Sequence, residues 1–238
     1  MENSRMSGGW PAPMAPTAAA EQVSTFLRRV YGWMCAGLGI TALVAFEVAN
    51  SPTILNHLVS DQFLYFGLML VELGLVFYLS ARATRLAPGT ATALFVGYAG
   101  LNGVTLSFLF LAYTGQSVTD AFVVTAGMFG AMALYGSMTK RSLAGLGQFV
   151  FMGLIGLVLA SLVGVFWHNN TLQFVIAAVG VIVFTGLTAW DAQRLKQMAL
   201  ATPEGQTGSL AIVGALSLYL NFINLFLSLL YFFGNRRE

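Results

Sequence analysis

The last apolar run of the chain, residues 209–234 (SLAIVGALSLYLNFINLFLSLLYFFG), most limits how this sequence can fold. It is long enough to cross a membrane, because a hydrocarbon core of about 30 Å requires about 20 apolar residues in a helix. Its middle nevertheless contains Asn221 and Asn224, which are three residues apart and therefore share one helical face. An amide that faces lipid lacks hydrogen-bond partners, which costs several kcal/mol. We therefore predict that this helix lies at the centre of a bundle.

Six further apolar runs precede this helix, and the composition assigns them to a membrane. The sequence is 57% hydrophobic and only 8% charged, whereas soluble domains contain about 25% charged residues. This is too little charge to cover a surface that faces water. The six runs span residues 30–49, 62–81, 90–113, 121–138, 146–166 and 171–190. Together with the last run, they predict an all-α polytopic membrane protein with seven transmembrane helices.

The domain organisation is simple. Residues 28–235 are predicted to form a single seven-helix transmembrane domain. Residues 1–27 are predicted to be a disordered cytoplasmic tail, because Pro11, Pro13 and Pro16 occur there among Ala, Ser and Gly. The single cysteine, Cys35, permits neither an internal disulfide nor a cysteine-based metal cluster.

The basic residues predict the orientation of the bundle. Four pairs fall on the side of the N-terminus: Arg28/Arg29, Arg82/Arg85, Lys140/Arg141 and Arg194/Lys196. The positive-inside rule then makes the N-terminus cytoplasmic. Arg236 and Arg237 are the exception, since an odd number of crossings places them outside. The alternative is a re-entrant last helix whose end returns to the cytoplasm.

The expected surroundings of the protein follow from the same pattern. The basic residues lie at helix ends, so the net charge of +2 does not indicate nucleic acid, and the expected partner is the lipid bilayer. The compact tail and short loops are typical of a bacterial inner membrane protein, with the endoplasmic reticulum as the alternative. No cofactor is indicated.

Ionisable groups inside membrane spans are the strongest pointers to function in such a chain. Glu72 lies near the middle of the second run, where it either lines an ion path or is a protonated carboxyl bonded to a neighbouring helix. Asp191 follows the sixth run, where it is either functional or an interfacial, solvated side chain. Arg82 either extends to the lipid headgroups or folds inward onto Asp191.

The residues do not support catalysis. His57 and His168 both fall on predicted outer loops, so neither is placed as the base for a serine nucleophile. Asp191 has no second intramembrane aspartate, as an aspartyl protease would require. No lysine lies in mid-span and no phosphate-binding loop occurs. We therefore expect that the protein is not an enzyme.

Three segments resemble the Bax inhibitor-1 family, also called the transmembrane Bax-inhibitor-motif family. They are TAWDAQRLK at 188–196, ALSLYLNFINLFLSLLYFFG at 215–234, and LNGVTLSFLFLAYTGQSVTDAFVVTAGMF at 101–129. The resemblance covers about residues 25–234. It implies a seven-helix bundle with the last helix in the centre, acting as a pH-sensitive calcium leak.

The resemblance also implies roles for individual residues. In members of this type, two aspartates on helices six and seven share a proton, and an arginine on helix two helps to latch the closed state. Asp191 matches the first aspartate, whereas Asn221 stands at the position of the second. Arg82 is the best match for the latch arginine, and it is a loose one.

The exchange of aspartate for Asn221 changes the expected chemistry. Two close carboxylates repel each other and bind one proton near neutral pH. Asn221 instead offers an amide N–H to ionised Asp191, so we predict weaker or acid-shifted pH gating. Calcium prefers several oxygen ligands, including carboxylates, so Asp191 alone is expected to contact Ca²⁺ only transiently.

The sequence therefore leaves two predicted functions. The first is a passive cation leak for Ca²⁺ with Asp191 as proton sensor or ion-attracting group, Asn221 as its partner, Arg82 as latch and Glu72 as an acid along the path. The alternative is a regulator of other membrane proteins, such as a membrane-bound protease or the stress and cell-death machinery.

Overall fold

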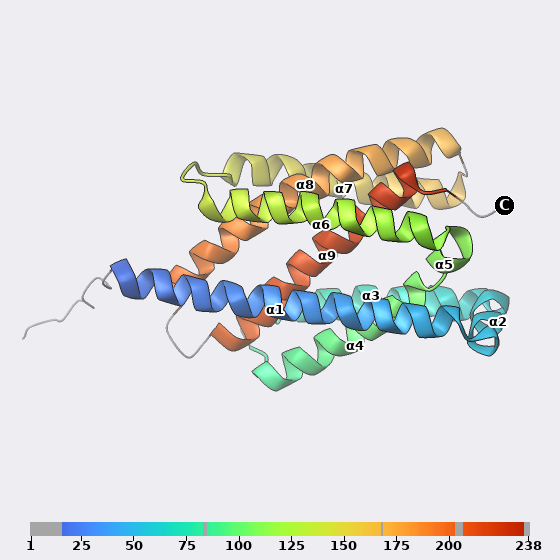
Figure 1. Ribbon diagram of the computed structural model, residues 1–238, viewed down its shortest axis with the longest axis horizontal. Helices are drawn as coiled ribbons and strands as arrows, with labels where there is room; N and C mark the ends of the chain where they lie inside the picture. Colours follow the sequence, from blue (N-terminus) through green and yellow to red (C-terminus); the bar gives the residue numbers. More distant parts are fainter. Residues whose placement is uncertain (1–15, 83–84, 168, 203–206, 236–238) are drawn as a thin grey trace, which may run out of the picture.

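The computed structural model describes residues 16–82, 85–167, 169–202 and 207–235, and the elements in these ranges are α-helices (Figure 1). They are α1 (Pro16–Ala49), α2 (Pro52–Ser60), α3 (Gln62–Ala81), α4 (Pro88–Leu106), α5 (Leu109–Ala112), α6 (Gly115–Met138), α7 (Ala144–Phe166), α8 (Asn170–Ala201) and α9 (Thr207–Phe233). The prediction of an all-α fold is confirmed for this part of the chain.

Six of the described helical segments are long and apolar enough to cross a membrane. They are Ala19–Ala49, Pro88–Ala112, Gly115–Met138, Ala144–Gly164, Asn170–Ala201 and Thr207–Phe233. The second predicted span corresponds to α3, whose apolar part, Phe66–Ala81, is shorter. The class of polytopic membrane protein is thus confirmed, while the count of seven spans stays a prediction.

The predicted third span is interrupted. The run 90–113 was expected to form one helix, but α4 ends at Leu106 and the short α5 begins at Leu109. Between them, the hydroxyl of Ser107 donates to the carbonyl of Val104 at 2.7 Å. Such local bonds offer the backbone an alternative to a continuous helix.

The predicted disordered tail is partly helical. α1 begins at Pro16, a residue well suited to the first helical position, so residues 16–27 are helical and that part of the prediction is wrong. Phe26 is buried, and the Gln22 amide donates to the carbonyls of Ala199 and Thr202 at 2.9 and 2.8 Å. These bonds fasten α1 to the end of α8. Residues 1–15 lie outside the described residues.

α9 is the most buried of the candidate spans. In its most apolar stretch, 67% of the residues are buried, against 17–44% in the other five. It packs against α1, α3, α4, α6 and α8, and it runs obliquely between α1 and α6 in Figure 1. Within it, the buried Tyr219 ring makes edge contacts with Phe95 and Tyr98, each with centroids 5.8 Å apart. The helix is unbroken over 27 residues.

Candidate functional site

Asp191 lies inside a helix rather than at its end. α8 continues past Trp190 to Ala201, and Asp191 is only 5% exposed. The side chain is therefore buried and not solvated, whereas its depth in the membrane stays a prediction. The following turn of α8 is fixed to the connection between α6 and α7. Gln193 accepts from the Leu143 N–H and donates to the Arg141 carbonyl, both at 2.8 Å.

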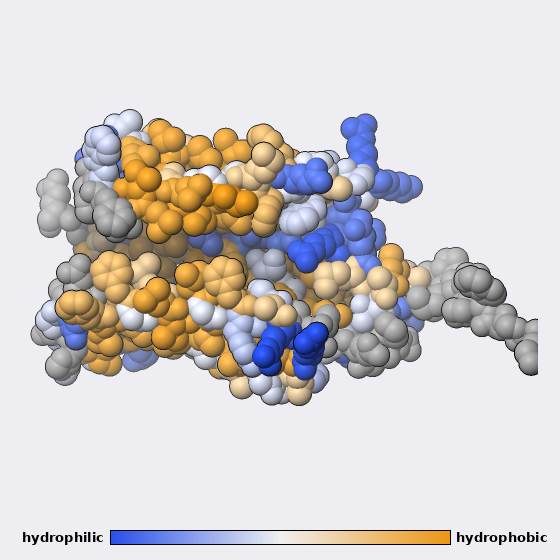
Figure 2. Space-filling model, turned by 180° about the vertical axis from the view of Figure 1, so that it is seen from behind, coloured by the Kyte–Doolittle hydropathy of each residue, from blue (hydrophilic) through white to orange (hydrophobic). Residues whose placement is uncertain are grey.

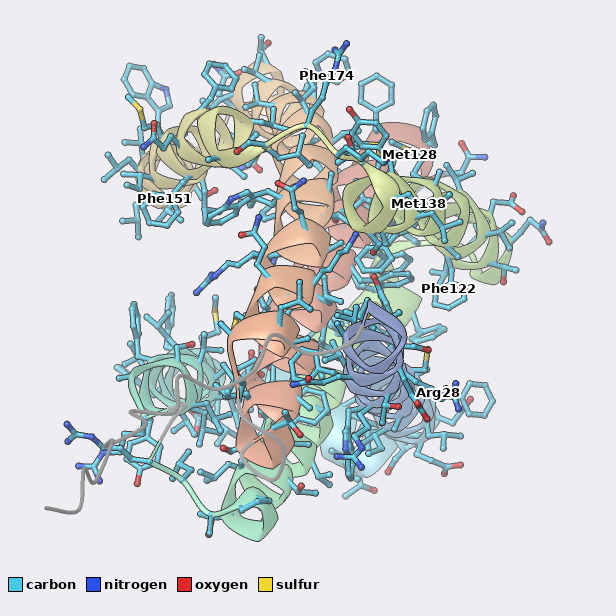
Figure 3. The ribbon with its side chains drawn as sticks, turned by 90° about the vertical axis from the view of Figure 1, so that its left-hand side faces the viewer. Arg28, Phe122, Met128, Met138, Phe151 and Phe174 are labelled. Atoms are coloured by element: carbon cyan, nitrogen blue, oxygen red, sulfur yellow. The ribbon has the colours of Figure 1, made fainter. Side chains whose placement is uncertain are left out.

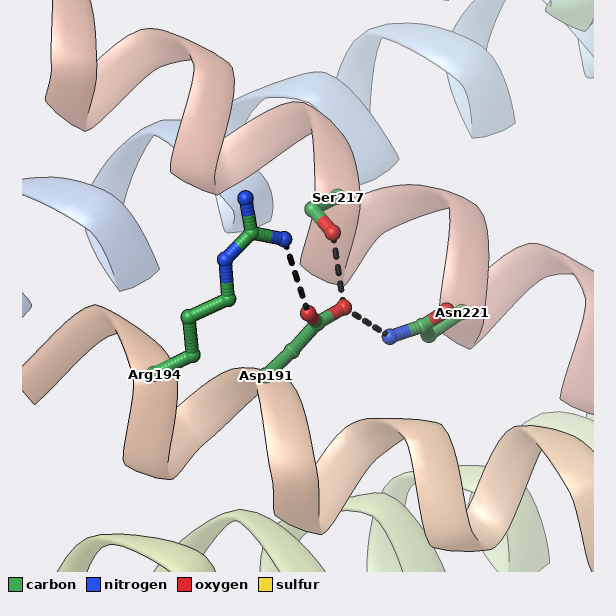
Figure 4. Close-up of polar contacts among 4 residues, drawn as sticks. All are labelled: Asp191, Arg194, Ser217 and Asn221. Atoms are coloured by element: carbon green, nitrogen blue, oxygen red, sulfur yellow. Dashed lines mark hydrogen bonds and ion pairs between the residues drawn. The ribbon is translucent and has the colours of Figure 1, made fainter. Parts of the chain in front are cut away.

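The Asp191 carboxylate is bound by two side chains of α9 (Figure 4). The Ser217 hydroxyl and the Asn221 amide donate to the same oxygen, Oδ2, at 2.7 and 2.8 Å. Ser217 and Asn221 are four residues apart, so they share one face of α9. An ionised carboxylate only accepts hydrogen bonds, which matches these two donors. The structure therefore brings together the predicted pair, Asp191 and Asn221.

The cation beside Asp191 is Arg194, one turn further along α8. Its Nη1 lies 4.0 Å from Asp191 Oδ1, and its side chain is 56% exposed. The guanidinium also lies over the Trp190 ring, 5.5 Å from the centroid. We did not single out Arg194 or Ser217 as site residues from the sequence. Their spacing in the sequence is the signal that could have identified them. Arg194 is three residues from Asp191 and Ser217 is four residues from Asn221, and residues at these spacings are neighbours on one helical face.

Arg82 lies apart from this cluster. It follows the last residue of α3, its side chain is exposed, and its guanidinium lies 5.3 Å from the centre of the Tyr78 ring. Among the ion pairs of the described residues, Asp191 pairs with Arg194 and not with Arg82. The inward-folded arrangement that would make Arg82 a latch on Asp191 is therefore not formed in this state.

Glu72 belongs to a second polar cluster, on the side of α3 that faces α4. Its carboxylate accepts from Thr105 Oγ1 at 2.5 Å and from Asn102 Nδ2 at 3.3 Å. The Asn102 carbonyl accepts from the Tyr219 hydroxyl at 3.0 Å, and that hydroxyl lies 2.6 Å from Thr41 Oγ1. We call these five residues the Glu72 network. It joins α1, α3, α4 and α9, and the structure does not bring Glu72 to Asp191.

A cavity of about 640 Å³ lies beside Asp191, with walls from α3, α7, α8 and α9. Asp191, Arg194, Ser217 and Asn221 line it, and most of its other lining side chains are apolar. Figure 2 shows the hollow between two apolar bands, over α7 above and α3 below, with hydrophilic residues gathered toward one end. In Figure 3, α3 and α7, which carries the labelled Phe151, lie on the same side of α8. The site is thus a carboxylate on the wall of a lateral cleft.

The carboxylate does not belong to a larger cluster of metal ligands. Within the described ranges, no group of three or more His, Cys, Asp or Glu side chains is gathered as a stable metal site would require. His57 and His168 were predicted on outer loops; the His57 side chain and residue 168 lie outside what the structure describes. Any cation at Asp191 would therefore meet one carboxylate and neighbouring neutral oxygens.

These features define a class: an integral membrane protein of α-helices with a buried, hydrogen-bonded aspartate between two of them. The chain belongs to the Bax inhibitor-1 family, since residues 23–238 match the family described as "Inhibitor of apoptosis-promoting Bax1". The predicted resemblance is confirmed.

Close relatives occur in several bacteria. The chain is 49% identical over 218 residues to the inner membrane protein YbhL of Escherichia coli, covering 90% of this chain and 93% of that protein. A protein of Deinococcus radiodurans is 44% identical over 226 residues, covering 94% of this chain and 96% of the relative. One from Borreliella burgdorferi is 41% identical over 215 residues, covering 90% and 93%. The likeness therefore extends through the whole bundle.

Proposed function

We propose that this protein is a passive cation leak that conducts Ca²⁺ and responds to pH through Asp191. The observation that carries the proposal is the buried Asp191 carboxylate, bound by Ser217 and Asn221 on the wall of a cavity of about 640 Å³. Ionisable residues inside membrane bundles are energetically costly, and they mark ion paths and proton relays. The cavity supplies part of such a path.

The proposed topology has seven crossings. The membrane is crossed by α1, α3, α4, α6, α7, α8 and α9, with α9 in the centre. The N-terminus lies in the cytoplasm, and the protein lies in the bacterial inner membrane. An unbroken α9 of 27 residues supports a crossing over a re-entrant helix. The likeness to a protein named as an inner membrane protein supports the location. Arg236 and Arg237 lie outside the described residues.

Opening of the path is proposed to require a rearrangement of α3, α8 and α9. In the described state, Asp191 is 5% exposed, because the side chains of α9 cover it. A proton on Asp191 weakens its ion pair with Arg194 and turns one of its acceptor oxygens into a donor. Both changes loosen the contact between α8 and α9. Movement of α3, which supplies Met69 and Leu73 to the cavity wall, would then widen the cavity.

The experiment that tests this proposal measures calcium entry into proteoliposomes loaded with an indicator dye, from pH 5 to pH 8. We expect the protein to pass Ca²⁺ above the level of empty liposomes, with a flux that varies with pH. Absence of flux from protein shown to be folded would contradict the leak. The alternative, regulation of a membrane-bound protease or of stress and cell-death machinery, would then be the function to pursue.

A further inference from the structure

We propose that the cavity beside Asp191 binds one acyl chain of an anionic glycerophospholipid from the surrounding bilayer, with the lipid phosphate at Arg194. The site is defined by the side chains that line the cavity and does not depend on whether the protein conducts ions. Three features of the cavity support this ligand: its length, its mostly apolar walls from α3, α7 and α8, and the exposed cation at one end.

The length of the cavity suits a chain within one leaflet. Its lining residues on α8 extend from Phe184 to Arg194, a distance of about 15 Å at 1.5 Å per residue. This is half of a hydrocarbon core of about 30 Å. The volume of about 640 Å³ falls within the range of about 300–1,000 Å³ that is usual for small-molecule sites. A single chain is thus a ligand of suitable size.

The walls from α3, α7 and α8 are mostly apolar and are accessible from the lipid, whereas Ser217, Asn221 and Asn224 make the α9 wall largely polar. The apolar lining residues come from α3, α7, α8 and α9: Met69, Leu73, Phe151, Leu154, Leu157, Val158, Leu162, Phe184, Leu187, Trp190 and Leu220. α3 packs mainly on α4 and α7 on α8, so the two walls stand apart. Met69, Leu73 and Val158 are exposed, although they also line the cavity. A chain can therefore enter sideways between α3 and α7.

The charge at one end favours an anionic headgroup. Arg194 is 56% exposed, and its one ion pair among the described residues is the long contact of 4.0 Å to Asp191. A guanidinium has five N–H donors, so several are left for a phosphate. Asp191 is the acidic residue among the described lining residues, and its Oδ2 is already bonded to Ser217 and Asn221. Trp190 adds the amphipathic ring that is common at headgroup level.

The experiment uses Trp190 as a reporter of the lipid in the cavity. The other tryptophans, Trp10, Trp33 and Trp167, are changed to Phe in the full chain, which is reconstituted in bilayers that contain brominated lipid. Quenching by brominated phosphatidylglycerol is compared with quenching by brominated phosphatidylcholine at equal mole fraction. We expect about fivefold preferential association of phosphatidylglycerol at Trp190, the size expected of one arginine at an anionic membrane surface.

A second reporter and matched variants separate the cavity from the general lipid shell. A chain that keeps only Trp167, which is 71% exposed at the end of α7, should show no such preference. Arg194→Gln should abolish the preference at Trp190, while Arg194→Lys and the distant Arg82→Gln should retain it. Val158→Phe, which narrows the cavity, should reduce quenching of Trp190 by both lipids. Equal preference at Trp190 and Trp167, or a preference that survives Arg194→Gln, would overturn the proposal.

Discussion

Replacing Asn221 by Asp should convert the site into a pair of carboxylates. The Asn221 amide nitrogen lies 2.8 Å from Asp191 Oδ2, so the new carboxylate would be in direct contact with the old one. Two unit charges about 4 Å apart interact by about 4 kcal/mol at an effective dielectric constant of about 20. Since one pH unit corresponds to about 1.36 kcal/mol, this repulsion can shift the binding of the shared proton by about 3 pH units toward alkaline pH.

The assay is the pH dependence of calcium flux in proteoliposomes for the wild type and Asn221→Asp. We expect the wild-type midpoint at acidic pH and the variant midpoint closer to neutrality. Asn224→Asp is the matched control, because Asn224 lines the same cavity but its amide donates to Leu220 of its own helix. It should shift the midpoint less. A wild-type midpoint near neutrality that moves to lower pH in Asn221→Asp would refute the reasoning.

Two further predictions concern the contacts that α8 and α9 make within the bundle. Gly136→Ala should destabilise the protein by about 1–3 kcal/mol, because the added methyl group would meet the backbone of Ala189 on α8. Gly130→Ala is the control on the same helix, since its methyl group would meet no other atom. It should be neutral or stabilising by up to about 1 kcal/mol. The measurement is the melting temperature of each variant in detergent, which should be lower for Gly136→Ala than for Gly130→Ala. Equal melting temperatures would contradict the prediction. Tyr219→Phe removes the hydroxyl of the Glu72 network and should cost about 1–2 kcal/mol. The exposed Tyr135→Phe is its control in the same assay, and a similar loss in both would show that the network contributes little.

The sequence predicted those features that depend on polarity alone. The low content of charged residues indicated a membrane protein, and the amides in an apolar helix indicated that this helix is surrounded by others in a bundle. The pairing of Asn221 with Asp191 was implied by the resemblance to the family, and the structure contains it. Polarity did not specify the partner of each amide, since Asn224 donates to the Leu220 carbonyl of its own helix.

Other features depend on information that hydropathy does not contain. The apolar pattern marks the thickness of the membrane and not the length of a helix, so it ended the sixth run at Trp190 although α8 continues to Ala201. The added turns are rich in Ala, Gln, Arg, Leu and Lys, which are strong helix formers. Arg82 was matched only loosely, whereas Arg194 is one turn from Asp191 on the same helix. The cavity arises from the separation of α3 and α7, which no local pattern specifies.

The most direct test of the central claim compares calcium flux through the wild type and Asp191→Asn at matched protein content from pH 5 to pH 8. Asn cannot take up the proton that Asp191 would, and it removes the charge beside Arg194. The account predicts that the wild-type flux varies with pH and that the flux of the variant does not. Identical pH profiles for the two proteins would contradict Asp191 as the sensor.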